Sequence, residues 1–209
     1  MSNSKDIGII DCGISNLGSI AQTVSNLGHN PIIVSDPELI SSKSHLIFPG
    51  QGTFSEGMRR INSLGWNEVL RSEVIDKRKP ILGICLGMQL LAKFGNEGGL
   101  VDGLGFLEGE VVKLECGGLR IPHIGWNTVH QSRDSRLFVN IPQNVDFYFS
   151  HSFILKLDED SIATANCNYG QSFTASLECK NIFGTQFHPE KSSKAGRQLL
   201  KNFCEVEIC

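Results

Sequence analysis

The sequence predicts an α/β fold: a doubly wound, mostly parallel sheet with helices on both faces, plus a smaller antiparallel sheet. The first observation is a β-α-β-β-α-β order of apolar and amphipathic stretches over residues 7–94. The second is that the strand segments are short, nearly continuous apolar runs, which are typical of strands buried on both faces. The third is the alternation of apolar and polar residues at 109–114, which indicates a more antiparallel region.

The predicted elements follow in chain order. Strands are predicted at 7–10, 32–34, 45–48 and 81–84. A helix is capped by Ser15 or Asn16, runs through Leu27 and stops at Gly28, and helical patterns also cover 55–64 and 66–77. Further short strands are predicted at 147–149, 161–165, 172–177 and 182–186, before a last helix from Ser192 or Ser193. No repeat or linker divides the pattern, so we expect a single domain over residues 1–209.

Composition and charge narrow the function classes. The chain is 40% hydrophobic and 20% charged, with a formal net charge of −3, which is typical of a globular protein with one core. Its short basic cluster, 77–79, indicates a solvated helix end, so we expect no nucleic-acid partner. No apolar run approaches membrane-spanning length, so we expect no membrane association.

The cysteines indicate a reducing compartment. Their number is odd, and they form neither C-x-x-C pairs nor a zinc-like spacing. They are Cys12, Cys85, Cys116, Cys167, Cys179, Cys204 and Cys209. Such usage fits free thiols better than a secreted disulfide framework, and the first residues lack the apolar segment of a signal peptide. We therefore expect a cytoplasmic protein without a metal site or a cofactor.

Cys85 stands at the junction between the predicted strand 81–84 and a helical pattern at 88–94. A strand that turns into a helix through G-x-C-x-G, here between Gly83 and Gly87, is a nucleophile elbow with sulfur in place of oxygen. The glycines allow close backbone approach, and the N–H groups at the helix start favour a thiolate and can hold an oxyanion. The plainer alternative is that Cys85 fills the core, because cysteine is among the most buried residue types.

A second motif supplies a base. His188 precedes Pro189, which pushes it into extended backbone, and there residues two apart point to the same side. Glu190 therefore lies beside the imidazole of His188, where a carboxylate fixes the tautomer and stabilises the imidazolium. A lone His-x-Glu is more often a surface pair, but after an elbow cysteine it predicts a nucleophile–base–orienter triad.

These motifs resemble those of the class I (triad) glutamine amidotransferases. The resemblance rests on GICLGMQLL around Cys85 and on FHPE around His188 and Glu190. Three segments, 122–127, 148–153 and 184–193, are similar to the glutaminase subunit of imidazole glycerol phosphate synthase. The resemblance covers essentially the whole chain and implies a flavodoxin-like fold.

The resemblance also implies roles for individual residues. Cys85 attacks the carboxamide of glutamine, His188 transfers protons and Glu190 orients His188. The implied oxyanion donors are in Leu86, Gln51 and Gly52. The implied glutamine-binding residues are Gly50, Gly52, Gln89, His151 and Ser152. From the residues alone, Gly52 could instead be a turn glycine, and Gln89 could cap its own helix.

A partner is implied in the same way: a (βα)₈ cyclase subunit of histidine biosynthesis, bound as a heterodimer. Asn16, Trp126, Tyr148 and Lys191 match interface or gating positions of this family. From the residues alone, Trp126 could equally be a core tryptophan and Lys191 a solvated lysine. The resemblance further implies weak activity until the partner binds its ligand, with a peptide flip at 50–52 as the switch.

The sequence departs from the family pattern at three places, and these leave other functions open. Gln51 replaces a small apolar residue, the segment 12–16 is less glycine-rich, and Phe153 stands where tyrosine is common. One alternative is a paralogous glutaminase that supplies ammonia for amidination of a bacterial surface sugar. Others are a catalytically silent scaffold and a cysteine hydrolase that acts on other γ-glutamyl bonds.

Overall fold

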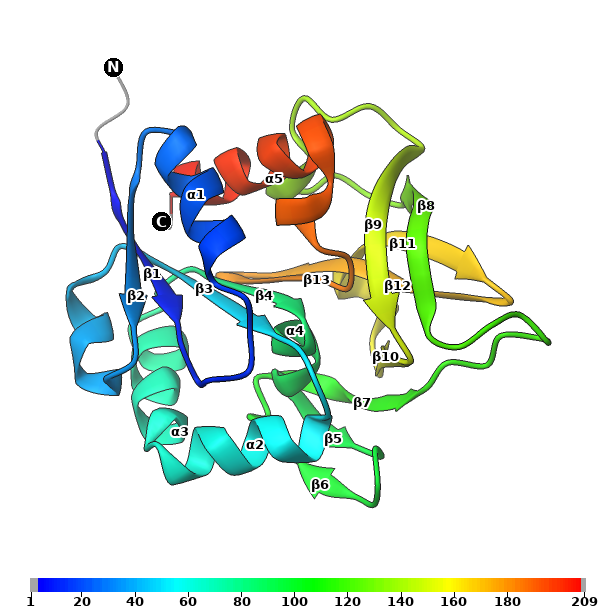
Figure 1. The fold of residues 1–209 in the computed structure, drawn as a ribbon, viewed down its shortest axis with the longest axis horizontal. Helices are drawn as coiled ribbons and strands as arrows, with labels where there is room; N and C mark the ends of the chain where they lie inside the picture. The colour runs from blue at the N-terminus through cyan, green and yellow to red at the C-terminus, as the bar shows by residue number, and fades with distance from the viewer. Residues whose placement is uncertain (1–3, 208–209) are drawn as a thin grey trace.

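The computed structural model describes residues 4–207, which form two sheets with helices packed on both faces of the larger one (Figure 1). The larger sheet has the strand order β2-β1-β3-β4-β13-β12-β11-β8-β9. Its first five strands are parallel: β2 (Asn30–Val34), β1 (Asp6–Ile10), β3 (His45–Gly50), β4 (Ile81–Cys85) and β13 (Ile182–Thr185). The other four are antiparallel: β12 (Gln171–Cys179), β11 (Ala163–Tyr169), β8 (His123–Gln131) and β9 (Val145–His151).

Helices separate into two groups, one on each face (Figure 1). On one face lie α1 (Gly18–Asn26) and α5 (Ser193–Glu205), whose apolar sides pack with Ile7 and Ile9 of β1. On the other face lie α2 (Phe54–Ser63) and α3 (Trp66–Leu70), followed by a π-helical segment (Arg71–Asp76). Short 3-10 segments occupy Pro37–Ser42, Arg136–Phe138, Asp160–Ile162 and Pro189–Lys191. The doubly wound prediction is therefore confirmed.

The smaller sheet differs from the prediction in one pairing. Its order is β10 (Phe153–Leu157), β7 (Leu107–Lys113), β5 (Ala92–Gly95) and β6 (Val101–Asp102). β7 pairs antiparallel with β10, as the alternation at 109–114 predicted, but it pairs parallel with β5. The smaller sheet is thus mixed, and most antiparallel strands of the second half extend the larger sheet.

The helix predicted after Cys85 is shorter than expected. α4 (Leu86–Leu90) ends after five residues, and the chain continues as β5 instead of a helix to Phe94. Ala92 pairs with Leu107 of β7, and its carbonyl accepts a hydrogen bond from the N–H of Gly105. Because these tertiary partners satisfy the backbone of 92–95, they override the local helical preference.

The start of α1 also differs from the prediction. α1 begins at Gly18 after Leu17, and neither Ser15 nor Asn16 caps it. Residues 11–16 form a loop instead, in which the N–H of Gly13 bonds Asp11 and the carbonyl of Ile14 accepts the N–H of Gln51. The predicted stop at Gly28 is confirmed, because this glycine has φ +86°.

Four further findings concern the elements and side chains of the described chain. β8 and β10 were not predicted, and the predicted helix 66–77 divides into α3 and the π-helical segment. No helix in the described part of the chain combines the length and apolar character needed to cross a bilayer. Within residues 4–207, no three His, Cys, Asp or Glu side chains gather as metal ligands would.

Candidate active site

Cys85 is the last residue of β4, with φ +54° and ψ −111°. Residues other than glycine rarely adopt this backbone conformation. The turn brings α4 directly onto the sheet. A Cβ at Gly87 would lie 1.7 Å from the carbonyl oxygen of Phe48, and one at Gly83 would lie 2.7 Å from the backbone of Met88. Both glycines of G-x-C-x-G are therefore required by close backbone contact, and the strain is located at Cys85.

The short α4 gives less electrostatic support to a thiolate at Cys85 than the sequence predicts. A helix of five residues carries a small macrodipole, so it does little to favour a thiolate at Cys85. The local N–H groups after the elbow remain as candidate oxyanion donors. Stabilisation of a negative sulfur must come mainly from side chains around it.

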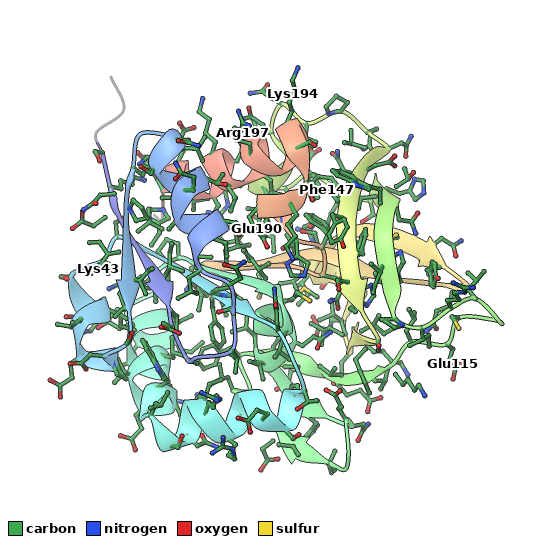
Figure 2. The ribbon with its side chains drawn as sticks, viewed as in Figure 1. Lys43, Glu115, Phe147, Glu190, Lys194 and Arg197 are labelled. Atoms are coloured by element: carbon green, nitrogen blue, oxygen red, sulfur yellow. The ribbon has the colours of Figure 1, made fainter. Side chains whose placement is uncertain are left out.

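His188 and Glu190 reach the same place from the other end of the chain. Nδ1 of His188 lies 2.9 Å from Oε1 of Glu190, and His188 lines the same cavity as Cys85. The backbone holds His188 in position because its N–H donates to the carbonyl of Tyr148 over 2.8 Å, and its own carbonyl accepts from Ser192. Figure 2 shows Glu190 inside the molecule beside the start of α1. The structure therefore brings the three predicted triad residues together.

The environment of His188 favours its protonated form. Burial by itself lowers the pKa of this imidazole, but the hydrogen bonds and charges of Cys85 and Glu190 outweigh burial and raise the pKa to about 9. An imidazolium at neutral pH stabilises a negative sulfur and carries the proton that a leaving amine needs. The arrangement is suited to nucleophilic attack by sulfur with acid catalysis by histidine.

The sulfur of Cys85 has two further polar neighbours. Nε2 of Gln186 lies 3.6 Å from Sγ, and the carbonyl oxygen of Ser150 lies 3.7 Å from it. Sequence reasoning did not assign a role to either residue. Gln186 lies in the FHPE motif segment, but its orientation depends on a contact with Gln89 that only the fold creates.

A cavity of about 270 Å³ opens over the triad. Of the predicted site residues it is lined by Cys85, Leu86, His188, Gln51, Gly52, Gln89, His151, Ser152 and Lys191. Gly50 does not line the cavity; it packs against Gly87 and Leu86 instead, where a Cβ would lie 2.9 Å from either. Gln89 donates to the carbonyl of Phe153 and to Gln186 rather than capping its helix.

The turn predicted to complete the oxyanion hole is closed against the preceding loop. The N–H of Gln51 donates to the carbonyl of Ile14 over 2.7 Å, so it does not point to the sulfur in this conformation. Gly52 has φ +101°, a conformation that favours glycine, and a Cβ at this position would meet no atom within 4 Å.

The cavity also contains residues that the sequence did not indicate. Glu97 lines it, and Oε2 of this carboxylate accepts the N–H of Phe54 over 2.7 Å. Glu97 follows β5 in a polar, glycine-rich stretch without any motif, so only its place in the fold could reveal it. A carboxylate here provides a negative charge at the rim of the cavity.

His151 belongs to a buried chain of hydrogen bonds. Its Nδ1 lies 3.0 Å from the carbonyl oxygen of Phe153, and its Nε2 lies 3.0 Å from Nδ1 of His123. Nε2 of His123 lies 3.3 Å from the amide nitrogen of Asn127. A carbonyl only accepts and an amide nitrogen only donates, so the chain is satisfied when both histidines are neutral with Nδ1 protonated.

Three of the predicted partner residues form one surface beside the cavity. Trp126 is 52% exposed, so it is not a core tryptophan; the buried one is Trp66. The ring of Trp126 meets that of Tyr148 edge to face at 6.2 Å, and the amine of Lys191 lies 5.7 Å from the centre of the Tyr148 ring. Asn16 is exposed in the loop before α1.

A larger cavity, of about 860 Å³, lies between β10 and β12. Its lining includes Lys113, Lys156 and Thr174 but none of the triad residues. Size therefore does not identify the reactive site here, and the convergence of nucleophile, base and carboxylate does.

Comparisons with known proteins agree with this geometry. The chain is 44% identical to the imidazole glycerol phosphate synthase subunit HisH 1 of Campylobacter jejuni (strain 81-176), over 96% of this chain and 100% of that protein. It is 42% identical to subunit HisH of Moorella thermoacetica, over 97% of this chain and 95% of that protein. Among solved structures, a glutamine amidotransferase of Thermotoga maritima superposes with a TM-score of 0.69 at 19% identity, over 97% of this chain and 84% of that one.

The structural likeness shows the fold, and the sequence relatives match nearly the whole chain. The family model described as glutamine amidotransferase class-I matches residues 8–206, which include the elbow and the FHPE motif. The chain therefore belongs to the class-I glutamine amidotransferase family.

Proposed function

We propose that the chain hydrolyses glutamine and passes the ammonia to a cyclase subunit of imidazole glycerol phosphate synthase in histidine biosynthesis. The observation that carries the proposal is that Cys85 and His188 line one cavity, with the carboxylate of Glu190 2.9 Å from His188 behind it. The HisH names of the relatives support the pathway. The cyclase is proposed as the partner in a heterodimer.

The chemistry follows from the protonation state of the triad. The sulfur of Cys85, with its proton on His188, attacks the carboxamide carbon of glutamine and forms a tetrahedral oxyanion. His188 gives its proton to the nitrogen, the C–N bond breaks, and ammonia leaves with a γ-glutamyl thioester behind. Water then gives a proton to His188 and attacks the thioester, and glutamate leaves as the sulfur regains its starting state.

Glutamine binding uses the polar lining of the cavity. The carboxylate of Glu97 is placed to pair with the α-ammonium of the substrate, because it is an anionic side chain of the lining. His151, Ser152 and Gln89 form the wall, and Gly52 leaves room for the substrate backbone. We propose these residues, together with Gly50 behind the elbow, as the glutamine site.

The resting oxyanion hole is incomplete, and this supports control by the partner. The backbone N–H of Leu86 follows the elbow, but the N–H of Gln51 is occupied by the carbonyl of Ile14. Rotation of the peptide at 50–52 would free that N–H and let it reach the oxyanion. One such donor changes rate by about 10²–10³ in a protease. Asn16 lies two residues beyond Ile14, so a partner on this loop can influence the turn.

The partner surface is proposed from exposed side chains around the cavity mouth. Trp126 and Ile124 are 52% and 60% exposed on β8, and Lys191 lines the cavity itself. Aromatic side chains at the centre of a surface are favoured in binding sites. Ammonia released at Cys85 could therefore pass to a partner docked here without crossing bulk water. The six described cysteines are unpaired, which supports the cytoplasm as the location.

The test compares two cysteine variants. Cys85→Ala should abolish glutamate release from glutamine, whereas Cys179→Ala should keep it, because Cys179 lies at the end of β12 and does not line the cavity. Unchanged glutamate release by Cys85→Ala would contradict the assignment of the nucleophile.

A second experiment identifies the acceptor of ammonia. Adding a histidine-pathway cyclase with its nucleotide substrate should raise the glutaminase rate of the wild-type chain by orders of magnitude. No stimulation would contradict the cyclase as partner and favour a surface-sugar acceptor. A wild-type chain that releases no glutamate under either condition would favour a silent scaffold.

A further inference from the structure

Gln186 is the first residue after β13, directly beside the elbow. Thr185 of β13 pairs with Ile84 of β4, so the next residue of each strand, Gln186 and Cys85, lie side by side at the same edge. Gln186 has no exposed surface, and its backbone N–H donates to the carbonyl of Ala175 over 2.9 Å. A buried amide must use both ends of its side chain, because an unpaired polar group in the interior costs about 1–3 kcal/mol.

The orientation of the Gln186 amide is determined by a chain of contacts. The carbonyl oxygen of Phe153 lies 2.8 Å from the amide nitrogen of Gln89 and can only accept. The same Gln89 nitrogen lies 3.0 Å from Oε1 of Gln186, which must therefore be the oxygen end. The NH₂ end of Gln186 consequently faces Sγ of Cys85 at 3.6 Å. An amide flip would place two N–H groups against each other.

The sulfur has few other means of carrying a negative charge. Cys85 is 6% exposed, so water solvates it poorly, and α4 is too short to supply a large dipole. The carbonyl of Ser150 at 3.7 Å favours S–H over S⁻. In the described structure Gln186 is the one side chain whose N–H lies within hydrogen-bonding distance of the sulfur, and His188 is the neighbouring group whose pKa Cys85 helps to raise. A fixed N–H donor to an ionised acceptor is roughly twice as strong as a neutral hydrogen bond.

We propose that Gln186 is a catalytic residue whose side-chain NH₂ holds the sulfur of Cys85 as a thiolate. The inference rests on the proposed glutaminase function and deepens it. Gln186 acts on the sulfur in two steps. Before attack it increases the thiolate fraction, and when the thioester is hydrolysed it stabilises the departing thiolate. Gln89 is a positioning residue, because it fixes the amide of Gln186 from the other end.

The test measures the ionisation of Cys85 without relying on turnover. The full chain is alkylated with iodoacetamide between pH 5 and 10, and peptide mass spectrometry follows Cys85, with half-buried Cys116 and Cys179 as internal references. Gln186→Met removes the donor, and Gln186→Glu keeps an acceptor for Gln89 while placing a carboxylate against the sulfur. Both substitutions should raise the pH at which the alkylation rate of Cys85 is half-maximal by about one pH unit or more. Gln22→Glu, an exposed site on α1, should leave it unchanged.

An unshifted Cys85 midpoint in either folded Gln186 variant would overturn the proposal. If circular dichroism shows that both variants are unfolded, a third variant, Gln89→Met, is used. It removes the contact that orients the amide of Gln186 but keeps that amide as a donor. A smaller upward shift of the Cys85 midpoint in this variant supports the proposal, and no shift overturns it. Glutamate release by the wild-type chain is measured in parallel. Its absence would contradict the glutaminase, while the alkylation midpoints would still decide the role of Gln186.

Discussion

At the scale of single residues, the charge of the site depends on how His188 is held. Burial and partners act in opposite directions on its pKa, and the partners Cys85 and Glu190 prevail. Because the folded-state pKa of about 9 exceeds the unfolded value of about 6.5, the native state binds the proton more tightly. The resulting contribution to stability is complete below about pH 6.5 and is lost as pH rises through about 9.

Glu190→Gln should lower the pKa of His188, because the substitution removes the negative charge beside Nδ1 while keeping similar shape. We expect kcat to fall by about 10²–10⁴, as in a protease whose orienting carboxylate becomes an amide. The pKa is measured by NMR titration of His188, and kcat by glutamate release. Glu178→Gln is the matched control, because it breaks the ion pair with Arg136 far from the cavity. Equal rates for Glu190→Gln and wild type would show that Glu190 does not orient His188.

At the scale of elements, β8 and β9 connect the exposed surface to the cavity. Trp126 pairs with Tyr148 on the outer face of these strands, and His123 pairs with His151 on the inner face. The inner pair is neutral for a physical reason: burial lowers the pKa of His123 to about 4 and that of His151 to about 3. Protonation of His151 would place a second N–H between the two rings, and protonation of His123 would turn an N–H toward the amide nitrogen of Asn127, so either would break the chain of hydrogen bonds.

This pair predicts a loss of stability in acid. A folded-state pKa below the unfolded value of about 6.5 means that the unfolded chain binds the proton first, so stability falls as pH drops below about 6.5. Each histidine should contribute up to about 2 kcal/mol of loss between pH 7 and pH 5. His123→Gln keeps an amide donor for His151 and should reduce that loss, as measured by urea unfolding at both pH values.

His45→Gln is the matched control for His123→Gln. Burial also lowers the pKa of His45 to about 4, but this histidine bonds Val206 and Ser44 away from the cavity. Both variants should be less sensitive to acid, and only His123→Gln should raise KM for glutamine, because His151 lines the cavity. An unchanged loss of stability between pH 7 and pH 5 in His123→Gln would contradict the neutral pair.

The same elements show which parts of the fold the sequence could predict. The apolar runs of β1, β3 and β4 and the elbow at Cys85 leave signals that can be seen in short stretches of sequence. These signals are continuous apolar residues in one case, and the pair of glycines at 83 and 87 that close backbone contact requires in the other. β5 and the short α4 have a tertiary cause, because Ala92 pairs with Leu107 of β7 and the chain continues there as a strand. No window of sequence contains that information.

The residues of the candidate site also fall into two groups: those that a short motif reveals and those that only the fold reveals. Cys85, His188 and Glu190 belong to short motifs whose chemistry can be recognised from residue type and spacing. Gln186 and Glu97 act through contacts with residues distant in the chain, such as Gln89 and Phe54. Their residue types are common in loops and surfaces, so only the folded arrangement distinguishes them.

At the scale of the whole molecule, the larger sheet separates two apolar cores, and the elbow lies where the central strand β4 ends. Cys85 belongs to the core under α1 and α5, and the next residue, Leu86, belongs to the core that includes α2 and α3. The two tryptophans lie in different environments, one inside a core and one on the surface. Trp66 has no exposed surface in the second core, whereas Trp126 is 52% exposed beside the cavity. Folding energy and partner binding can therefore be tested with the same substitution at two sites.

Trp66→Ala should reduce the free energy of unfolding by about 3–5 kcal/mol, because it leaves a cavity in a packed core. Trp126→Ala should change it by less than about 1 kcal/mol, since half of the side chain already contacts water. For binding the order reverses: Trp126→Ala should weaken the complex with a cyclase by at least about 2 kcal/mol, or roughly thirtyfold in Kd. Urea unfolding and calorimetric titration measure the two quantities. A Trp126→Ala chain that binds and responds to the cyclase as wild type does would place the partner on another face, and the route for ammonia would then have to leave the cavity elsewhere.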